Sequence, residues 1–244
     1  MKPFLKIGAL AGGGAGLALA LFLEIVGERT IERAVALEAA TQPAGATHHE
    51  MFSRVTQQIG GGIGAVLYGI CLGLIFGVVF AATRHLLRSK TDWRRAMTVA
   101  AAGFVTVFLI PFVKYPANPP AVGDPDTITR RTALYLIMLA WSVVATWSAW
   151  RVARWLRDGR GLPEERWAPL TALTYAAIVG LGLTVLPGPP DRVTAPATLV
   201  WRFRLASAGG AAVLWATLGL AAGLLAQTRR YGPRRARKEE ITTR

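Results

Sequence analysis

The sequence predicts an all-α integral membrane protein with about six transmembrane helices. Apolar residues make up 52% of its 244 residues and charged residues only 17%, a balance too apolar for a soluble domain of this size. The basic residues stand in clusters between apolar stretches of roughly 20 residues, the length with which a helix crosses about 30 Å of hydrocarbon. A helix also satisfies its own backbone hydrogen bonds in lipid. We therefore expect one membrane domain, residues 1–228, and a basic cytoplasmic tail, residues 229–244.

The first three predicted spans are residues 4–26, 59–83 and 96–113. The first follows Lys2 and Lys6, a pattern that a cleavable signal peptide shares. Its apolar run continues past the potential cleavage point, however, which favours a retained helix. Whether the segment is cleaved stays open at this point.

The last three predicted spans are residues 132–150, 169–186 and 205–227. Pro125 precedes the fourth span and Pro196 precedes the sixth. A proline is well tolerated in the first turn of a helix, so each marks the expected start of the helix that contains the span. The fifth is the weakest, since it is short and ends at a run of prolines and glycine, residues 187–190.

Most of the 28 Lys and Arg residues fall at the N-terminus, in residues 84–95, in residues 151–166 and in the tail. Loops rich in these residues stay in the cytoplasm. The helices are therefore expected to form three hairpins with both chain ends inside. A sequence similarity offset by about 70 residues relates helices three and four to helices five and six as a parallel repeat. Pro119 and Pro120 match Pro189 and Pro190, and Arg131 matches Arg202.

Glycines recur at the four-residue spacing that lets membrane helices pack closely. We expect these positions to be contacts between helices: Gly8, Gly12, Gly16, Gly69, Gly73, Gly77, Gly219 and Gly223. The same spacing occurs at Gly60 and Gly64.

Glu24 is the only carboxylate within the six predicted spans, and Glu28 and Glu32 follow it at helical spacing. An acid at membrane depth is a candidate cation ligand or proton site. Arg131 and Arg202 lie in the second turn of their helices, where the helix dipole disfavours a cation that has no partner. The alternative for Glu24 is therefore an ion pair to one of these arginines, which would close the bundle on its outer side as a gate.

His48, His49 and Glu50 lie together in the first outer loop. Imidazole and carboxylate suit borderline divalent metals such as Co²⁺, Ni²⁺ and Zn²⁺. Adjacent histidines do not point the same way on a helix, so a shared metal would need a loop conformation. A solvated polar loop is the alternative.

The sequence carries no enzyme motif: it has no zinc-protease motif, no phosphate-binding glycine loop and no nucleophile elbow. We therefore expect no catalytic residues and no tightly bound cofactor. The basic residues of the tail favour an anionic membrane surface over nucleic acid as their partner.

Residues 111–131, PFVKYPANPPAVGDPDTITRR, resemble an outer loop of the CbtA family of predicted cobalt transporter subunits. Residues 27–38, GERTIERAVALE, and 196–207, PATLVWRFRLAS, resemble the same family. The resemblance covers nearly the whole chain. It singles out a motif in the second outer loop: Lys114, Tyr115, Asn118, Asp124 and Asp126.

The resemblance implies a multi-pass subunit for Co²⁺ uptake in the bacterial cytoplasmic membrane, linked to cobalamin supply. It also implies a small, single-helix, histidine-bearing partner, CbtB, with Co²⁺ as substrate. The family is usually described with fewer spans than are counted here, and some relatives have a more histidine-rich outer loop. The alternative function is a non-transporting membrane scaffold that assembles with other subunits. Oligomeric state, metal selectivity and energy source stay open.

Overall fold

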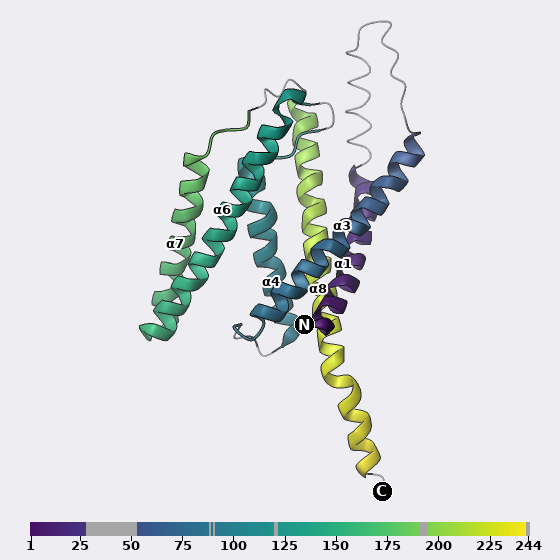
Figure 1. Ribbon diagram of the computed structural model, residues 1–244, viewed down its shortest axis with the longest axis vertical. Helices are drawn as coiled ribbons and strands as arrows, with labels where there is room; N and C mark the ends of the chain where they lie inside the picture. The colour runs from purple at the N-terminus through teal and green to yellow at the C-terminus, as the bar shows by residue number, and fades with distance from the viewer. Residues whose placement is uncertain (28–52, 88, 90, 120–121, 191–194, 243–244) are drawn as a thin grey trace, which may run out of the picture. The chain divides into compact units, whose positions relative to one another are not determined.

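The computed structural model describes residues 1–27, 53–87, 89, 91–119, 122–190 and 195–242 (Figure 1). In these residues every regular element is a helix. Six helical segments are long and apolar enough to cross a membrane: Lys2–Gly27, Val55–Thr83, Asp92–Lys114, Ile128–Gly159, Glu164–Val185 and Ala197–Thr228. The predicted all-α class and the predicted number of spans are confirmed.

The elements follow the chain in this order: α1 (Lys2–Phe22), the π-helix η1 (Leu23–Gly27), α3 (Arg54–Thr83), α4 (Asp92–Gly103), the π-helix η2 (Phe104–Leu109), α5 (Ile110–Lys114), the 3₁₀-helix η3 (Pro125–Thr127), α6 (Ile128–Arg154), the π-helix η4 (Trp155–Gly159), α7 (Glu164–Val185) and α8 (Ala197–Thr242). The third span therefore joins α4, η2 and α5.

All six spanning helices begin before the predicted spans, and polar side chains cap two of them, α3 and α4, outside the apolar stretch. The Ser53 side chain accepts a hydrogen bond from the Thr56 N–H at the start of α3, at 3.3 Å. The Thr91 side chain does the same for the Arg94 N–H at the start of α4. These hydroxyls satisfy backbone donors that the first helical turn leaves free.

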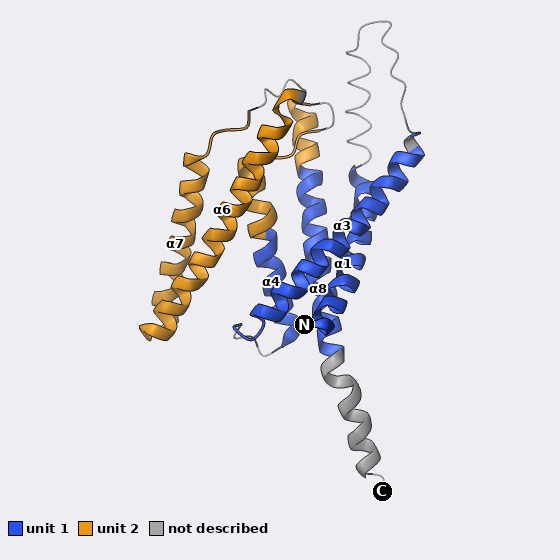
Figure 2. Cartoon of the chain, in the orientation of Figure 1, with its two compact units in different colours: residues 1–104, 205–244 blue, residues 105–204 orange. Residues whose placement is uncertain are grey.

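The chain divides into two compact units, shown in different colours in Figure 2. Unit 1 contains residues 1–104 and 205–244, and unit 2 contains residues 105–204. Each is described by itself below.

In unit 1, α1 and α3 lie side by side and antiparallel (Figure 1), with glycine against glycine. A Cβ added at Gly12 would lie 2.9 Å from the Gly73 Cα, and one added at Gly69 would lie 2.6 Å from the Gly16 Cα. Gly8 and Gly77 complete the contact. The two backbones therefore touch directly, which only glycine permits.

The glycine spacing does not guarantee a contact. A Cβ at Gly60 or Gly64 would meet nothing within 4 Å, although both lie on α3. These two glycines leave open space, in contrast to the three that follow them along the same helix.

Further glycines in unit 1 pack against side chains instead of backbone. A Cβ at Gly219 of α8 would lie 2.7 Å from the Ala100 Cβ of α4, and one at Gly223 would lie 2.9 Å from the Trp93 Cδ1. Gly103 lies beneath the Trp215 ring. Small residues thus bring α4 and α8 together.

In unit 2, α6 packs against α7, two helices that the sequence assigned to different hairpins. The Trp141 indole lies over Gly182 and donates a hydrogen bond to the Ile178 carbonyl at 2.7 Å. The grouping into three hairpins, the orientation of the chain ends and the parallel repeat stay predictions.

Substituting Gly12 with valine should separate α1 from α3, because the added carbons would meet the Gly69 and Gly73 backbone. Overpacking of this kind costs about 1–3 kcal/mol. For a chain of this size we expect a thermal unfolding midpoint lower by roughly 3–10 °C in purified protein. Gly14→Val is the matched control, since a Cβ there meets nothing within 4 Å. An equal loss in both variants would contradict the packing account.

Candidate functional site

Several side chains of the second outer loop motif gather in unit 2. The outer loop cluster, as we name it, consists of Lys114, Tyr115, Ala117, Asn118 and Arg204, which come from the end of α5, the loop after it and the start of α8. Two of these side chains contact the end of α7, and Arg204 contacts the loop itself. The cluster thus connects three helical elements of the unit.

Lys114 and Tyr115 supply donors to the C-terminal end of α7. The Lys114 Nζ donates to the Leu183 carbonyl at 2.7 Å, and the Tyr115 hydroxyl donates to the Pro187 carbonyl at 2.8 Å. The last carbonyls of a helix have no partner within it. Here the residues that follow include Pro187, Pro189 and Pro190, which have no N–H to offer. The lysine also lies at the negative end of the helix dipole, where a cation is favoured.

Arg204 fixes the loop. Its Nε donates to the Ala117 carbonyl at 3.3 Å, and its Nη2 donates to the Asn118 Oδ1 at 3.1 Å. The guanidinium fork suits such a paired contact, because its N–H groups point in fixed directions. The loop from residue 116 to residue 120 contains three prolines and therefore depends on side-chain donors.

Sequence reasoning chose Arg202 as the important arginine of α8, because it matches Arg131 in the repeat. The structure places Arg202 on an exposed position and gives the loop contact to Arg204. Two residues apart on a helix, the two side chains point in different directions. No sequence signal distinguished them, and only the packing of the loop did.

Asp124 and Asp126 organise the start of α6. The Asp124 Oδ1 accepts from the Asp126 N–H at 2.9 Å, and the Asp124 carbonyl accepts from the Thr127 hydroxyl at 2.7 Å. Asp124 therefore caps η3, the single turn that leads into the helix. Asp126 is exposed, and Arg131 lies in the first turns of α6.

The contacts of Lys114 with Leu183 and of Tyr115 with Pro187 join residues 69 and 72 positions apart in the sequence. These separations are close to the offset of the predicted repeat, which itself stays a prediction.

Glu24 lies in η1, the last turn of the first span, and its side chain is exposed within unit 1. Its predicted partners, Arg131 and Arg202, belong to unit 2, so the predicted gate stays a prediction. Glu28, Glu32, His48, His49 and Glu50 lie outside the described residues. The proposed metal capture in the first outer loop is therefore untested.

Unit 2 also holds buried and half-buried hydroxyls within its membrane-spanning helices. The Thr106 and Thr146 hydroxyls lie 2.8 Å apart, and the latter donates to the Ser142 carbonyl at 3.0 Å. Ser142 is fully buried, and its own Oγ has no partner in the structure. Sequence reasoning missed this group, since threonine and serine are common in apolar helices and only contact between η2 and α6 brings them together.

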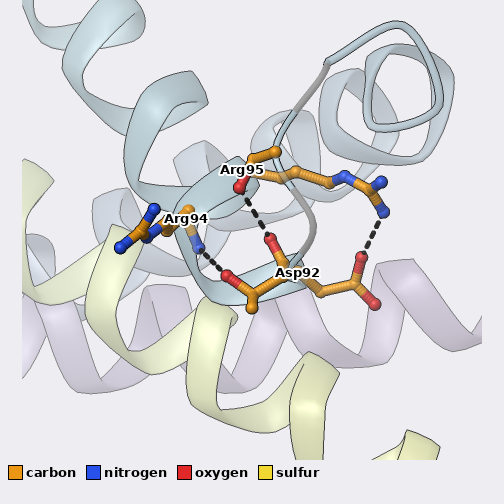
Figure 3. A network of polar contacts seen from close by, with 5 residues as sticks. Asp92, Arg94 and Arg95 are labelled. Atoms are coloured by element: carbon orange, nitrogen blue, oxygen red, sulfur yellow. Dashed lines mark hydrogen bonds and ion pairs between the residues drawn. The ribbon is translucent and has the colours of Figure 1, made fainter.

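A carboxylate that sequence reasoning overlooked is Asp92, which is only 4% exposed. Its Oδ1 accepts from the Arg95 Nη1 at 2.9 Å, next to the cap that Thr91 makes to Arg94 (Figure 3). Negative charge is favoured at a helix N-terminus. The predicted span began at residue 96, and the aspartate therefore fell outside it. Among the described residues, no three His, Cys, Asp or Glu side chains are grouped so that they could hold a metal ion.

Comparison with known families shows to which family the chain belongs. The model of a family described as probable cobalt transporter subunit (CbtA) matches residues 1–227. The chain belongs to the CbtA family. Searches of curated proteins and of solved structures find no match.

The CbtA match covers the first five spans and all but the last residue of the sixth. The family is one of probable cobalt transporter subunits, and the fold has six helices that can span a membrane. Both therefore indicate a multi-pass membrane protein concerned with cobalt and ion transport. The word subunit in the family description also implies a partner.

Replacing Arg204 with glutamine should loosen the CbtA outer loop, because both hydrogen bonds to residues 117 and 118 involve its guanidinium. Hydrogen bonds from charged groups contribute about 1.5–3 kcal/mol each. Losing both bonds should lower the thermal unfolding midpoint by roughly 6–20 °C. Arg202→Gln is the matched control, since it removes the same charge from an exposed position two residues away. Equal midpoints for the two variants would contradict this role.

Tyr115 should make stability depend on pH at the alkaline end. Burial raises the pKa of its hydroxyl above the usual value of 10.0, so the unfolded chain loses this proton before the folded one does. The stabilisation is fully present below pH 10 and is lost as the pH rises through the raised pKa. The difference in unfolding midpoint between the unaltered protein and Tyr115→Phe should therefore shrink above pH 10. A difference that stays constant across this range would contradict the assignment.

Proposed function

We propose that this chain is the membrane subunit through which Co²⁺ enters a bacterial cell, located in the cytoplasmic membrane and serving cobalamin supply. The observation that carries the proposal is the family match over residues 1–227, together with six helices that can span a membrane. The partner that the word subunit implies would be a small histidine-bearing protein of the CbtB type.

The charge at membrane depth supports a cation path near Glu24. A carboxylate within an apolar span is costly unless it has a partner or a function. Glu24 is exposed in its unit and lies in a π-helical turn, an irregularity that is frequent at functional sites. On this proposal Co²⁺ is collected by the outer loop that contains His48, His49 and Glu50 and then passes Glu24.

The chemistry of cobalt explains why a partner is needed. Co²⁺ must exchange its bound water for oxygen or nitrogen ligands on the way through the membrane. The described part of the chain offers no grouping of three strong ligands, although the hydroxyls of Thr106 and Thr146 and backbone carbonyls at the proline breaks supply neutral oxygens. Histidines from a second subunit would complete the ligand set.

The membrane potential is a sufficient energy source for inward movement. Moving a divalent cation inward through 100 mV yields roughly 4.6 kcal/mol. No nucleotide-binding motif is present in the sequence, so any further drive would come from a partner.

A non-transporting scaffold is the alternative function. The close glycine contacts of α1 with α3 would suit assembly of a complex as well as a transporter. These glycines already contact one another within unit 1, however, which leaves them unable to contact another subunit. The family description also favours transport. Metal dependence separates the two functions.

The experiment measures labelled Co²⁺ uptake in cells that lack other cobalt importers. The cells express this chain alone, with the histidine-bearing partner, or as Glu24→Gln with the partner. We expect uptake that needs this chain, and a decrease of at least about tenfold in the variant, because removing a charged ligand at membrane depth costs more than about 1.4 kcal/mol.

Glu164→Gln is the control, since it removes an exposed carboxylate from the first turn of α7. No uptake in any combination, with both proteins verified in the membrane, would overturn the cobalt function and leave the scaffold as the better account. Uptake that Glu24→Gln leaves unchanged would overturn the path and keep the function.

A further inference from the structure

The C-terminal end of α6 and the π-helix η4 that follows it carry several pairs of arginine and tryptophan. The Arg151 guanidinium lies 5.7 Å from the centre of the Trp147 ring, Arg154 lies 5.2 Å from Trp150, and Arg160 lies 4.8 Å from Trp155. Stacking on an aromatic face holds a guanidinium in place and leaves its N–H edge free to donate. The positive-inside rule assigns this end to the cytoplasmic surface.

A hollow of about 260 Å³ lies among these side chains, lined by Arg151, Arg154, Trp155 and Asp158. Drug-sized molecules occupy sites of about 300–1,000 Å³. The hollow is therefore suited to a small polar group, such as the headgroup of a larger ligand.

The charge around the hollow favours an anion. Asp158 is held by Arg157 through hydrogen bonds of 2.6 and 2.8 Å, whereas its contact with Arg154 is 3.8 Å long. Three arginines, Arg151, Arg154 and Arg157, therefore stand against the single carboxylate of Asp158. This ratio leaves an excess of positive charge around the hollow.

An exposed apolar stripe leads along α6 to the hollow. Ile137, Val144 and Trp147 are 48%, 56% and 59% exposed, and they lie at helical spacing on the face that continues to Arg151. A ligand that fits this arrangement has an anionic head and a hydrocarbon tail parallel to the helix. A soluble anion has no hydrocarbon tail with which to contact the stripe.

We propose that the hollow and the stripe together form a binding site for one anionic phospholipid. Its phosphodiester lies between the Arg151 and Arg154 guanidinium groups, which donate hydrogen bonds to the phosphate oxygens. Trp155 contacts the headgroup glycerol, and an acyl chain covers Trp147 and Val144. Paired guanidinium contacts with phosphate give orientation as well as attraction.

The test is native mass spectrometry of the purified full chain with phosphatidylglycerol and with phosphatidylcholine of the same acyl chains. We expect one tightly retained phosphatidylglycerol and weaker retention of phosphatidylcholine. In Arg151→Gln/Arg154→Gln, the affinity for phosphatidylglycerol should fall by about tenfold or more. Each basic group near an anionic lipid strengthens binding roughly fivefold, and the variant removes two of them.

Arg94→Gln/Arg166→Gln is the matched control: it removes two exposed arginines that also belong to the predicted inner loops but do not line the hollow. An equal loss in the control, or equal retention of the two lipids by the unaltered protein, would overturn the proposal. The comparison of lipids needs no substitution and therefore decides even if a variant does not fold. Displacement of the lipid by glycerol 3-phosphate at equal concentration would also overturn it, because the site would then recognise a soluble phosphate ester.

Discussion

The constraint on which this structure depends is that backbone polar groups at membrane depth must find partners inside the protein. Helices meet that requirement along their length, and the difficulty is concentrated where they end. α7 ends in a proline-rich loop that has few N–H groups to offer, and Lys114 and Tyr115 supply the donors instead. Arg204 does the same for the proline-rich loop after α5. Lys114 and Tyr115, two residues of the outer loop motif, thus complete backbone hydrogen bonding in unit 2.

Close packing between helices is the second consequence of the membrane environment. Apolar side chains gain little by leaving hydrocarbon for a helix surface, so helices associate through direct backbone contact and polar bonds. Gly8, Gly12, Gly69 and Gly73 provide that contact between α1 and α3. This partnership also bears on the first span, because cleavage there would remove the helix against which α3 is built.

The same packing leaves few strong metal ligands in the described residues, which sets the character of the proposed transport. A path lined by one carboxylate and neutral oxygens would bind Co²⁺ weakly, and weak binding allows an ion to leave as well as to enter. A histidine-bearing partner would then supply selectivity. The arginines have separate roles: Arg204 donates to the backbone of the loop after α5, and Arg151 and Arg154 stack on tryptophans at the proposed lipid site.

The sequence by itself determined the helical class, the number of spans and the family, because the length of apolar runs and a distinctive loop motif are local properties. It also picked out the glycines that meet between α1 and α3, since their spacing places them on one helix face. It could not tell these from Gly60 and Gly64, which face open space. Nor could it find Arg204 in place of Arg202, the buried Asp92, or the hydroxyls of Thr106 and Thr146. Those depended on which surfaces of distant segments come into contact, and only the tertiary structure decided that.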